Sequence, residues 1–128
     1  MKPVKPVAPR AFPHIWMEQL AKRSVEGMVD LYLPTAVLVP TYNRDVLRGK
    51  EQLAAYFKRF LAKDSLTGAV NNVVGQRVGK AGVFSGIYTF YFRDGAMPQQ
   101  VRARYTFVVV PTRSGARILT HHSSEVPK

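Results

Sequence analysis

The sequence contains no cysteine in its 128 residues. This absence excludes disulfides, thiolate nucleophiles and cysteine-type zinc sites together. No apolar run approaches the roughly 20 residues that span a bilayer, so we expect no membrane-spanning segment. The first residues, MKPVKPVAPRAFPH, hold four prolines and no continuous apolar stretch, which is not the pattern of a signal peptide. The cytoplasm is therefore the expected compartment.

Acidic residues are also scarce: eight Asp and Glu stand against 19 Lys and Arg, for a net charge of +11. A basic chain can bind nucleic acid through its phosphates. Here the cations are spread along the chain, without a dense basic tract, an RNA-binding aromatic motif or a zinc-knuckle spacing. We therefore do not expect nucleic acid as a partner, and we assign the charge to solubility or to an acidic ligand.

The length predicts one globular domain with its own core. Residues 1–13 are rich in proline and basic residues, and we expect them to form a flexible arm ahead of a single domain over residues 14–128. Within residues 13–34 the apolar spacing is helical, and Ser24 and Gly27 divide it into two short helices, with Ser24 as the N-cap of the second. Residues 35–41, TAVLVPT, predict a short buried strand that Pro40 stops.

The clearest amphipathic pattern lies in GKEQLAAYFKRFLAK, residues 49–63, which predicts a helix. After residue 69 the period changes to two, and four segments predict strands joined by tight turns. These strands cover residues 69–79, 82–93, 100–110 and 116–124. Helices followed by a strand meander predict an α+β domain whose antiparallel sheet is covered by helices on one face.

The second face of this sheet is also apolar. In GVFSGIYTFYFR one alternate set contains Phe84, Tyr88 and Phe90, and the other contains Ile87 and Tyr91. An antiparallel sheet usually exposes one polar face to water. A second apolar face predicts that another subunit covers it, so we expect a homodimer or a larger ring.

Five blocks in this order resemble a known group: LYLPTAVLVPT, GKEQLAAYFKRFL, SGIYTFYFRDG, ARYTFVVV and HHSS. Over about residues 14–127 the chain resembles the nuclear-transport-factor-2-like superfamily. It is similar in particular to bacterial stand-alone proteins, some of them SnoaL-like, that resemble the association domain of calcium/calmodulin-dependent protein kinase II. The resemblance implies a cone-shaped α+β fold, with N-terminal helices packed on a strongly curved, mainly antiparallel sheet around a pocket. It also implies assembly through the outer face of the sheet.

The same superfamily contains ketosteroid isomerase and SnoaL-type cyclases, so their catalytic positions can be compared with this chain. The aspartate base of ketosteroid isomerase, which precedes a proline, corresponds here to Val39. The tyrosine that donates to the oxyanion corresponds to Trp16, whose indole N–H can donate a hydrogen bond but supplies no phenol proton. Isomerisation by that mechanism is therefore not expected. Ala116 also departs from the family, which usually carries tryptophan there.

The candidate site centres on the paired histidines near the C-terminus. Adjacent strand residues point to opposite faces, so His121 and His122 cannot both enter a pocket. The resemblance places Leu119, His121 and Ser123 inward. His121 could then act as a proton donor, acceptor or ligand contact, while the structural alternative is a histidine pair that is hydrogen-bonded within the sheet.

Arginine and aromatic residues complete the expected pocket. Arg104 could bind a carboxylate with its guanidinium fork, or instead form an ion pair at the rim or interface. A β-bulge in the last hairpin would decide whether Arg104 shares a face with His121. The full set of expected pocket residues is Trp16, Tyr42, Tyr88, Arg104, His121 and Ser123.

The sequence therefore supports two interpretations. The first is a homo-oligomeric binding or assembly module with a pocket for a small anionic or polar aromatic ligand. The alternative is a small isomerase, dehydratase or cyclase in which His121 is the candidate catalytic residue, working with an arginine or a tyrosine. No metal site and no cofactor are expected, because the histidines lack a metal-binding spacing.

Overall fold

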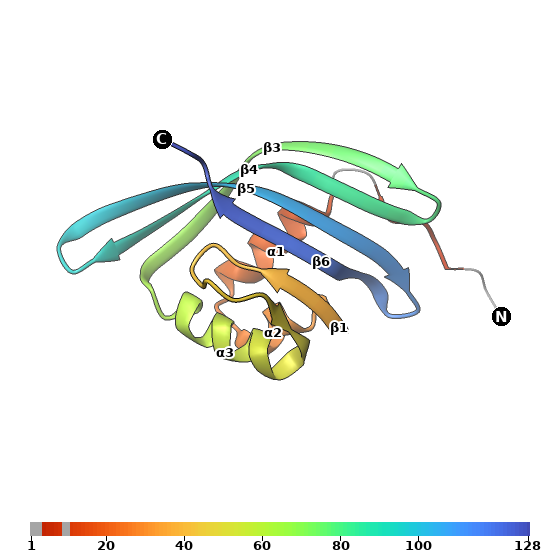
Figure 1. The fold of residues 1–128 in the computed structure, drawn as a ribbon, viewed down its shortest axis with the longest axis horizontal. Helices are drawn as coiled ribbons and strands as arrows, with labels where there is room; N and C mark the ends of the chain where they lie inside the picture. Colours follow the sequence, from red (N-terminus) through yellow and green to blue (C-terminus); the bar gives the residue numbers. More distant parts are fainter. Residues whose placement is uncertain (1–3, 9–10) are drawn as a thin grey trace.

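The computed structural model describes residues 4–8 and 11–128. Three helices, α1 (Phe12–Ala21), α2 (Val25–Val29) and α3 (Gly49–Leu61), lie on one side of a sheet (Figure 1). The strands are β1 (Tyr32–Val39), β2 (Leu47–Arg48), β3 (Asp64–Val78), β4 (Ala81–Asp94), β5 (Met97–Thr112) and β6 (Gly115–Glu125). The expected α+β class is confirmed. No helix within the described ranges has both the length and the apolar character needed to span a membrane.

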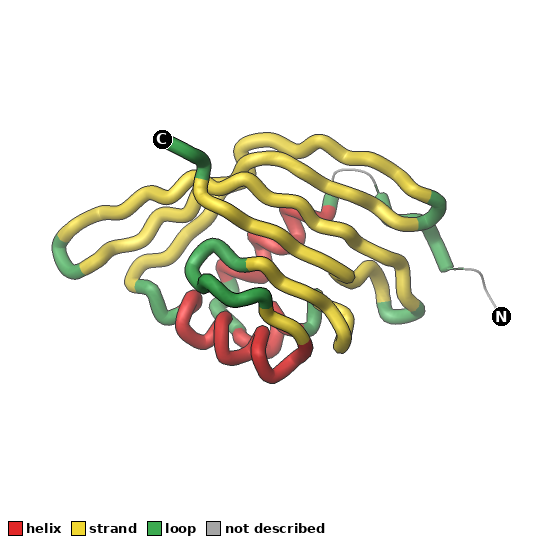
Figure 2. Tube along the Cα trace, in the orientation of Figure 1, coloured by secondary structure: helices red, strands yellow, loops and turns green. Residues whose placement is uncertain are grey.

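The sheet is six-stranded and curved, with the order β2-β1-β6-β5-β4-β3. All neighbouring strands run antiparallel except β1 and β6, which pair in parallel. Figure 2 shows the long strands β3 to β6 crossing above the helices, and the β4–β5 hairpin extends beyond them on the left. The short strand β2 was not predicted, because two residues are too few to show a period.

The helices form where their sequences favour them. The Ser24 side chain accepts a hydrogen bond from the backbone N–H of Gly27 at 3.0 Å and begins α2, as its sequence predicted, although Gly27 lies inside this helix. In α3 the expected apolar set is buried against the sheet. These residues are Leu53, Tyr56, Phe57, Phe60 and Leu61. The hydrophobic stripe of α3 thus positions a row of aromatic rings below the sheet.

Part of the N-terminal segment lies against the domain. Val7 is buried, and its backbone N–H donates to the carbonyl of Lys80 at 3.0 Å. The Arg77 guanidinium reaches the Val7 carbonyl at 3.4 Å. The described residues 4–8 therefore follow the β3–β4 hairpin, and α1 begins at Phe12, two residues before the domain boundary expected from the sequence.

One glycine in β4 is required by a close approach of the neighbouring strand. A Cβ at Gly86 would lie 2.2 Å from the carbonyl oxygen of Asn72 and 2.8 Å from the Tyr105 hydroxyl. That hydroxyl donates to the same carbonyl at 2.7 Å. Since the nearest atom belongs to the backbone, a methyl group cannot be accommodated by rotating a side chain.

We predict that Gly86→Ala lowers the free energy of unfolding by about 2 kcal/mol, within the range for overpacked cores. Gly68→Ala is the matched control, because its nearest neighbour is the flexible Met17 side chain, with Sδ at 2.6 Å. Urea denaturation of both variants measures the difference. An equal or smaller loss for Gly86→Ala would contradict this role.

Candidate functional site

A chain of hydrogen-bonded polar side chains runs through the core between the helices and the sheet. The Trp16 indole N–H donates to the Tyr32 hydroxyl at 3.0 Å, and this hydroxyl lies 2.8 Å from Nδ1 of His121. On the other side of the imidazole, Nε2 lies 3.1 Å from the Tyr88 hydroxyl. Strand β6 thus holds His121 between two tyrosines that come from β1 and β4.

The chain continues from Tyr88 toward the edge of the core. The Tyr88 hydroxyl donates to Oγ of Ser123 at 2.6 Å, and Ser123 contacts Oγ1 of the half-buried Thr41. Within the described residues, no buried side-chain nitrogen or oxygen lacks a partner. Such a network is stable only when each member is satisfied, and this one meets that condition.

The donors and acceptors fix a direction along this chain. The indole can only donate, so Tyr32 accepts from Trp16 and has its own proton free to give to Nδ1 of His121. A neutral imidazole then donates a hydrogen bond from Nε2 to the Tyr88 hydroxyl, and this hydroxyl donates a hydrogen bond to Ser123. The reverse order would leave the Tyr32 proton without an acceptor among these contacts. The hydrogen bonds from Trp16 to Ser123 therefore point in one direction, and in the last contact either Ser123 or Thr41 can donate.

Burial keeps the members of this chain uncharged. Burial lowers the pKa of His121 to about 3, with a smaller contribution from the neighbouring His122. Burial also raises the pKa of Tyr32 and of Tyr88 well above the usual value, which the hydrogen bonds with Trp16 and Ser123 offset only in part. At neutral pH the imidazole is therefore neutral and both phenols keep their protons. His121 does not change its protonation state near pH 7.

Aromatic rings fill the space around His121. Phe107 stacks on the imidazole with ring centroids 4.0 Å apart, and Trp16 meets it edge-on at 5.4 Å. The cavity beside His121 and Ser123 measures about 10 Å³, and the rings of Tyr56, Phe57 and Phe60 belong to its lining. One water molecule needs about this volume. The expected pocket is thus closed by the protein's own side chains.

Above this cavity a second aromatic group lies at the surface. Tyr42 packs on Phe60 and Phe92, and the Lys63 ammonium lies 4.6 Å and 4.5 Å from the ring centroids of Tyr42 and Phe92. Tyr42 is 36% exposed, and partial burial raises its pKa to about 12, with a smaller contribution from Glu125. Tyr42 is therefore a rim residue rather than a member of the buried chain.

A one-residue bulge in β6 decides which side chains face this core. Val109 pairs with Ile118, but Val108 pairs with Thr120, so Leu119 is the extra residue. Ile118, His121 and Ser123 are buried, whereas Leu119 is 40% exposed. The expectation that His121 and Ser123 face inward agrees with this placement, and the expectation for Leu119 was wrong because strict alternation is broken there.

The same register separates Arg104 from the cavity. Phe107 pairs with His121 and Tyr105 with Ser123, and directly paired residues share a face, so the inward residues of β5 are those with odd numbers. Arg104 pairs with Ser124 and is exposed on the opposite face. The expected pocket arginine is therefore wrong: the structure brings together Trp16, Tyr88, His121 and Ser123, but not Arg104.

Three members of the site were not found from the sequence. Tyr32 begins β1, and Thr41 follows Pro40 at the end of that strand. Tyr56 was predicted as helix core but not as part of a site. The parallel pairing of Leu38 with His121 places β1 beside β6, and this long-range contact leaves no local signal in either segment.

Comparison with known proteins identifies the family of this chain. The sequence matches the calcium/calmodulin dependent protein kinase II association domain family over residues 10–127. The chain belongs to this family. No curated protein gave a match.

Solved structures agree with the assignment to the association domain family. A Xanthomonas campestris protein named for this association domain is 31% identical, with a TM-score of 0.86 over 100% of this chain and 99% of its own. A Streptomyces avermitilis protein of the nuclear-transport-factor-2-like family, named as a dehydratase, is 16% identical with a TM-score of 0.80, covering 91% of each chain. A Salmonella enterica superfamily protein is 20% identical with a TM-score of 0.77, covering 91% of this chain and 87% of its own. The expected superfamily and fold are confirmed.

In this chain the Trp16 indole N–H donates its hydrogen bond to a buried hydroxyl of the core and does not point into an open pocket. Its indole N–H is committed to Tyr32, so it is not free to stabilise an oxyanion. Val39 stands at the end of β1, where ketosteroid isomerase has its base, and a valine accepts no proton. The ketosteroid isomerase mechanism therefore has neither its base nor its donor in this chain.

We predict that His121 makes the folded association domain sensitive to acid. Because its pKa is about 3 in the folded protein and about 6.5 when unfolded, protonation favours the unfolded state. The contribution is fully present above pH 6.5 and is lost as the pH falls toward 3, at about 1.4 kcal/mol per pH unit. Urea denaturation between pH 4 and pH 7 measures this slope.

His121→Gln is the control, because glutamine keeps an acceptor and a donor but does not titrate in this range. The variant should be less stable at pH 7 and should show a shallower loss on acidification than the wild type. Equal slopes in both proteins would mean that His121 is not the group that takes up the proton.

Proposed function

We propose that the protein is a homo-oligomeric assembly module whose subunits pair through the outer face of the sheet. We define the outer face as the side of β4, β5 and β6 that points away from the helices. Its residues are Val83, Ser85, Ile87, Thr89, Tyr91, Arg102, Arg104, Thr106, Val108, Thr120, His122 and Ser124. The observation that carries the proposal is that no helix of the described residues covers this face (Figure 1), on which Val83, Ile87, Tyr91 and Val108 form apolar surface.

Apolar side chains extend across the outer face and around it. Tyr91 is 40% exposed, and Val74 of the neighbouring β3 is 64% exposed. Leu119, pushed outward by the bulge, is 40% exposed. Removing such surface from water yields about 25 cal/mol per Å², so a second copy placed over it would be favoured.

The interior supports assembly over catalysis. Both ring nitrogens of His121 are engaged by tyrosine hydroxyls, and the imidazole is neutral. The cavity beside it has room for about one water molecule. The family name, an association domain, also fits a module whose task is to bind copies of itself. The cytoplasm remains the expected compartment.

We predict that Val108→Glu, on the outer face and away from Arg102 and Arg104, raises the dissociation constant of the oligomer by at least 100-fold. Val108 pairs with Val83 and Thr120 and is half-buried in the single chain, so its side chain is not needed for the core. A buried carboxylate in the interface would be costly. Sedimentation velocity across a micromolar concentration series measures the change.

Ala55→Glu is the matched control, because Ala55 is exposed on α3, on the opposite side of the molecule. This variant should assemble as the wild type does. A wild type that stays monomeric near 14.4 kDa, or a Val108→Glu variant with unchanged mass, would refute assembly through this face.

The second candidate function is binding of a small ligand in the cavity, with a dehydratase, isomerase or cyclase activity as its catalytic form. It is favoured by the polar chain, which ends at Ser123 and Thr41 on the cavity wall. Solved structures of the same fold also include proteins named as dehydratases. Because no cationic side chain lines the cavity, a neutral polar aromatic ligand fits it better than an anion. Such a ligand must displace the rim, where Tyr42 and Lys63 lie.

For this candidate we predict that a neutral phenol raises the melting temperature in a thermal-shift assay, whereas its carboxylate analogue does not. Thr41→Val removes the hydroxyl at the end of the chain and should weaken phenol binding about fivefold or more, the value of one hydrogen bond. If no phenol shifts the melting temperature, the polar chain is a structural feature of the core and this second function is withdrawn.

A further inference from the structure

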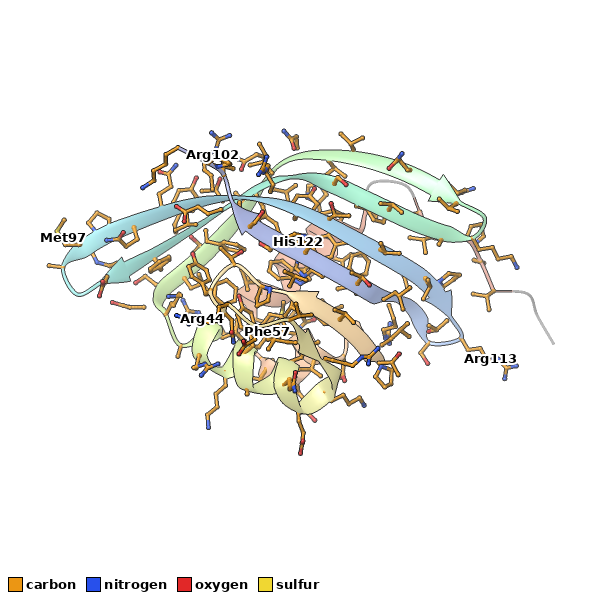
Figure 3. All side chains as sticks on the ribbon, in the orientation of Figure 1. Arg44, Phe57, Met97, Arg102, Arg113 and His122 are labelled. Carbon is orange, nitrogen blue, oxygen red and sulfur yellow. The ribbon has the colours of Figure 1, made fainter. Side chains whose placement is uncertain are left out.

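Two arginines of the outer face lie next to each other without partners. Arg102 and Arg104 are separated by one residue on β5, so they share a face, with Cα atoms about 7 Å apart. Both are exposed, and within residues 4–8 and 11–128 neither guanidinium has a hydrogen bond or an ion pair. In Figure 3 Arg102 lies above the sheet, on the side away from the helices and from Phe57.

The surroundings of this arginine pair offer the hydroxyl of Ser124 but no carboxylate, since the buried Thr89 hydroxyl donates to Asn71. Arg102 pairs across the sheet with Thr89, and Arg104 pairs with Ile87 on one side and Ser124 on the other. None of the outer-face residues defined above is acidic. The acid whose register brings it to this side is Asp64, and it pairs with Arg93, four positions along β4 from Thr89.

Symmetric pairing through this face would leave these charges uncompensated. In a two-fold interface the same patch is used by both copies, so each arginine meets only residues of the outer face. Burying guanidinium groups without an anionic partner is costly. The proposed assembly therefore requires a counter-charge that the face itself does not contain.

We propose that Arg102 and Arg104 form a binding site for an oxyanion of the phosphate or sulfate class, which is held between two copies of this chain. Paired guanidinium forks match the geometry of such oxyanions and bind them with two hydrogen bonds each. The hydroxyl of Ser124 lies on the adjacent strand, in register with Arg104. This inference rests on the proposed assembly through the outer face, and it makes that assembly dependent on anions.

The test is sedimentation equilibrium of the full chain in chloride and in inorganic phosphate at equal ionic strength. Phosphate should lower the dissociation constant at least tenfold for the wild type. In the double variant Arg102→Gln/Arg104→Gln, phosphate should have no effect, and the dissociation constant in chloride should fall below that of the wild type because the repulsion is removed.

The control variant is Arg44→Gln/Arg48→Gln, which makes the same change of charge at two exposed residues on the helix side of the molecule. In Figure 3 Arg44 lies on the side opposite Arg102. This variant should keep the full phosphate effect. An equal phosphate effect in both double variants would show general screening and overturn the site.

The remaining outcomes separate this inference from the proposed function. Dimers that form through the outer face with no response to phosphate overturn the anion site and leave the assembly standing. If Asp64→Asn weakens these dimers instead, the counter-charge comes from Asp64 of the second copy, and the anion site is again overturned. If every protein is monomeric in both buffers, the assembly and the anion site fail together. Circular dichroism of each variant confirms that it is folded before the comparison.

Discussion

The extra residue at Leu119 in β6 is the constraint on which the rest of the molecule depends. Before Leu119 in the sequence, Ile118 packs into the core. After it, His121 and Ser123 also pack into the core, because the bulge shifts the in–out alternation by one residue. Without the bulge, the last strand would turn His122 inward and place His121 on the same face as Arg104. The bulge thus decides which residues of β6 reach the hydrogen-bonded core, whereas the regular pairing of β4 with β5 places Arg102 and Arg104 on the outer face.

The two faces of the sheet also differ in the polar groups that they carry. On the helix side, the polar groups are neutral, and their hydrogen bonds point in one direction from Trp16 to Ser123. On the outer side, the guanidinium groups of Arg102 and Arg104 remain in water. This neutral interior chain adds specificity to the packing, because removing one of its members costs about the free energy of one hydrogen bond. In the proposed assembly, an anion and a second copy would cover this charged face.

Much of this fold could be predicted from the sequence, since the helix of residues 49–61 and the four long strands have clear apolar periods. Ser24 as an N-cap and His121 as an inward residue also agree with their patterns. The bulge could not be predicted, because no residue type near Leu119 requires it; it follows from fitting both ends of β6 between β5 and β1. Tyr32 and Thr41 were missed for the same reason, since only the parallel pairing of β1 with β6 brings them to His121.

The filled cavity follows from the choice of side chains on α3. Tyr56, Phe57 and Phe60 project from one helical face, and their rings occupy the volume where a smaller set would leave a pocket. Phe60 meets Phe90 edge-on at 5.1 Å, and Tyr56 stacks on Phe60 at 5.8 Å, so the helix and the sheet are joined through these rings. Close packing of this kind stabilises the domain and removes the space that a substrate would need. The rings thus fill the core on the helix side of the sheet, and the proposed assembly uses the opposite side, which the helices of the described residues leave uncovered.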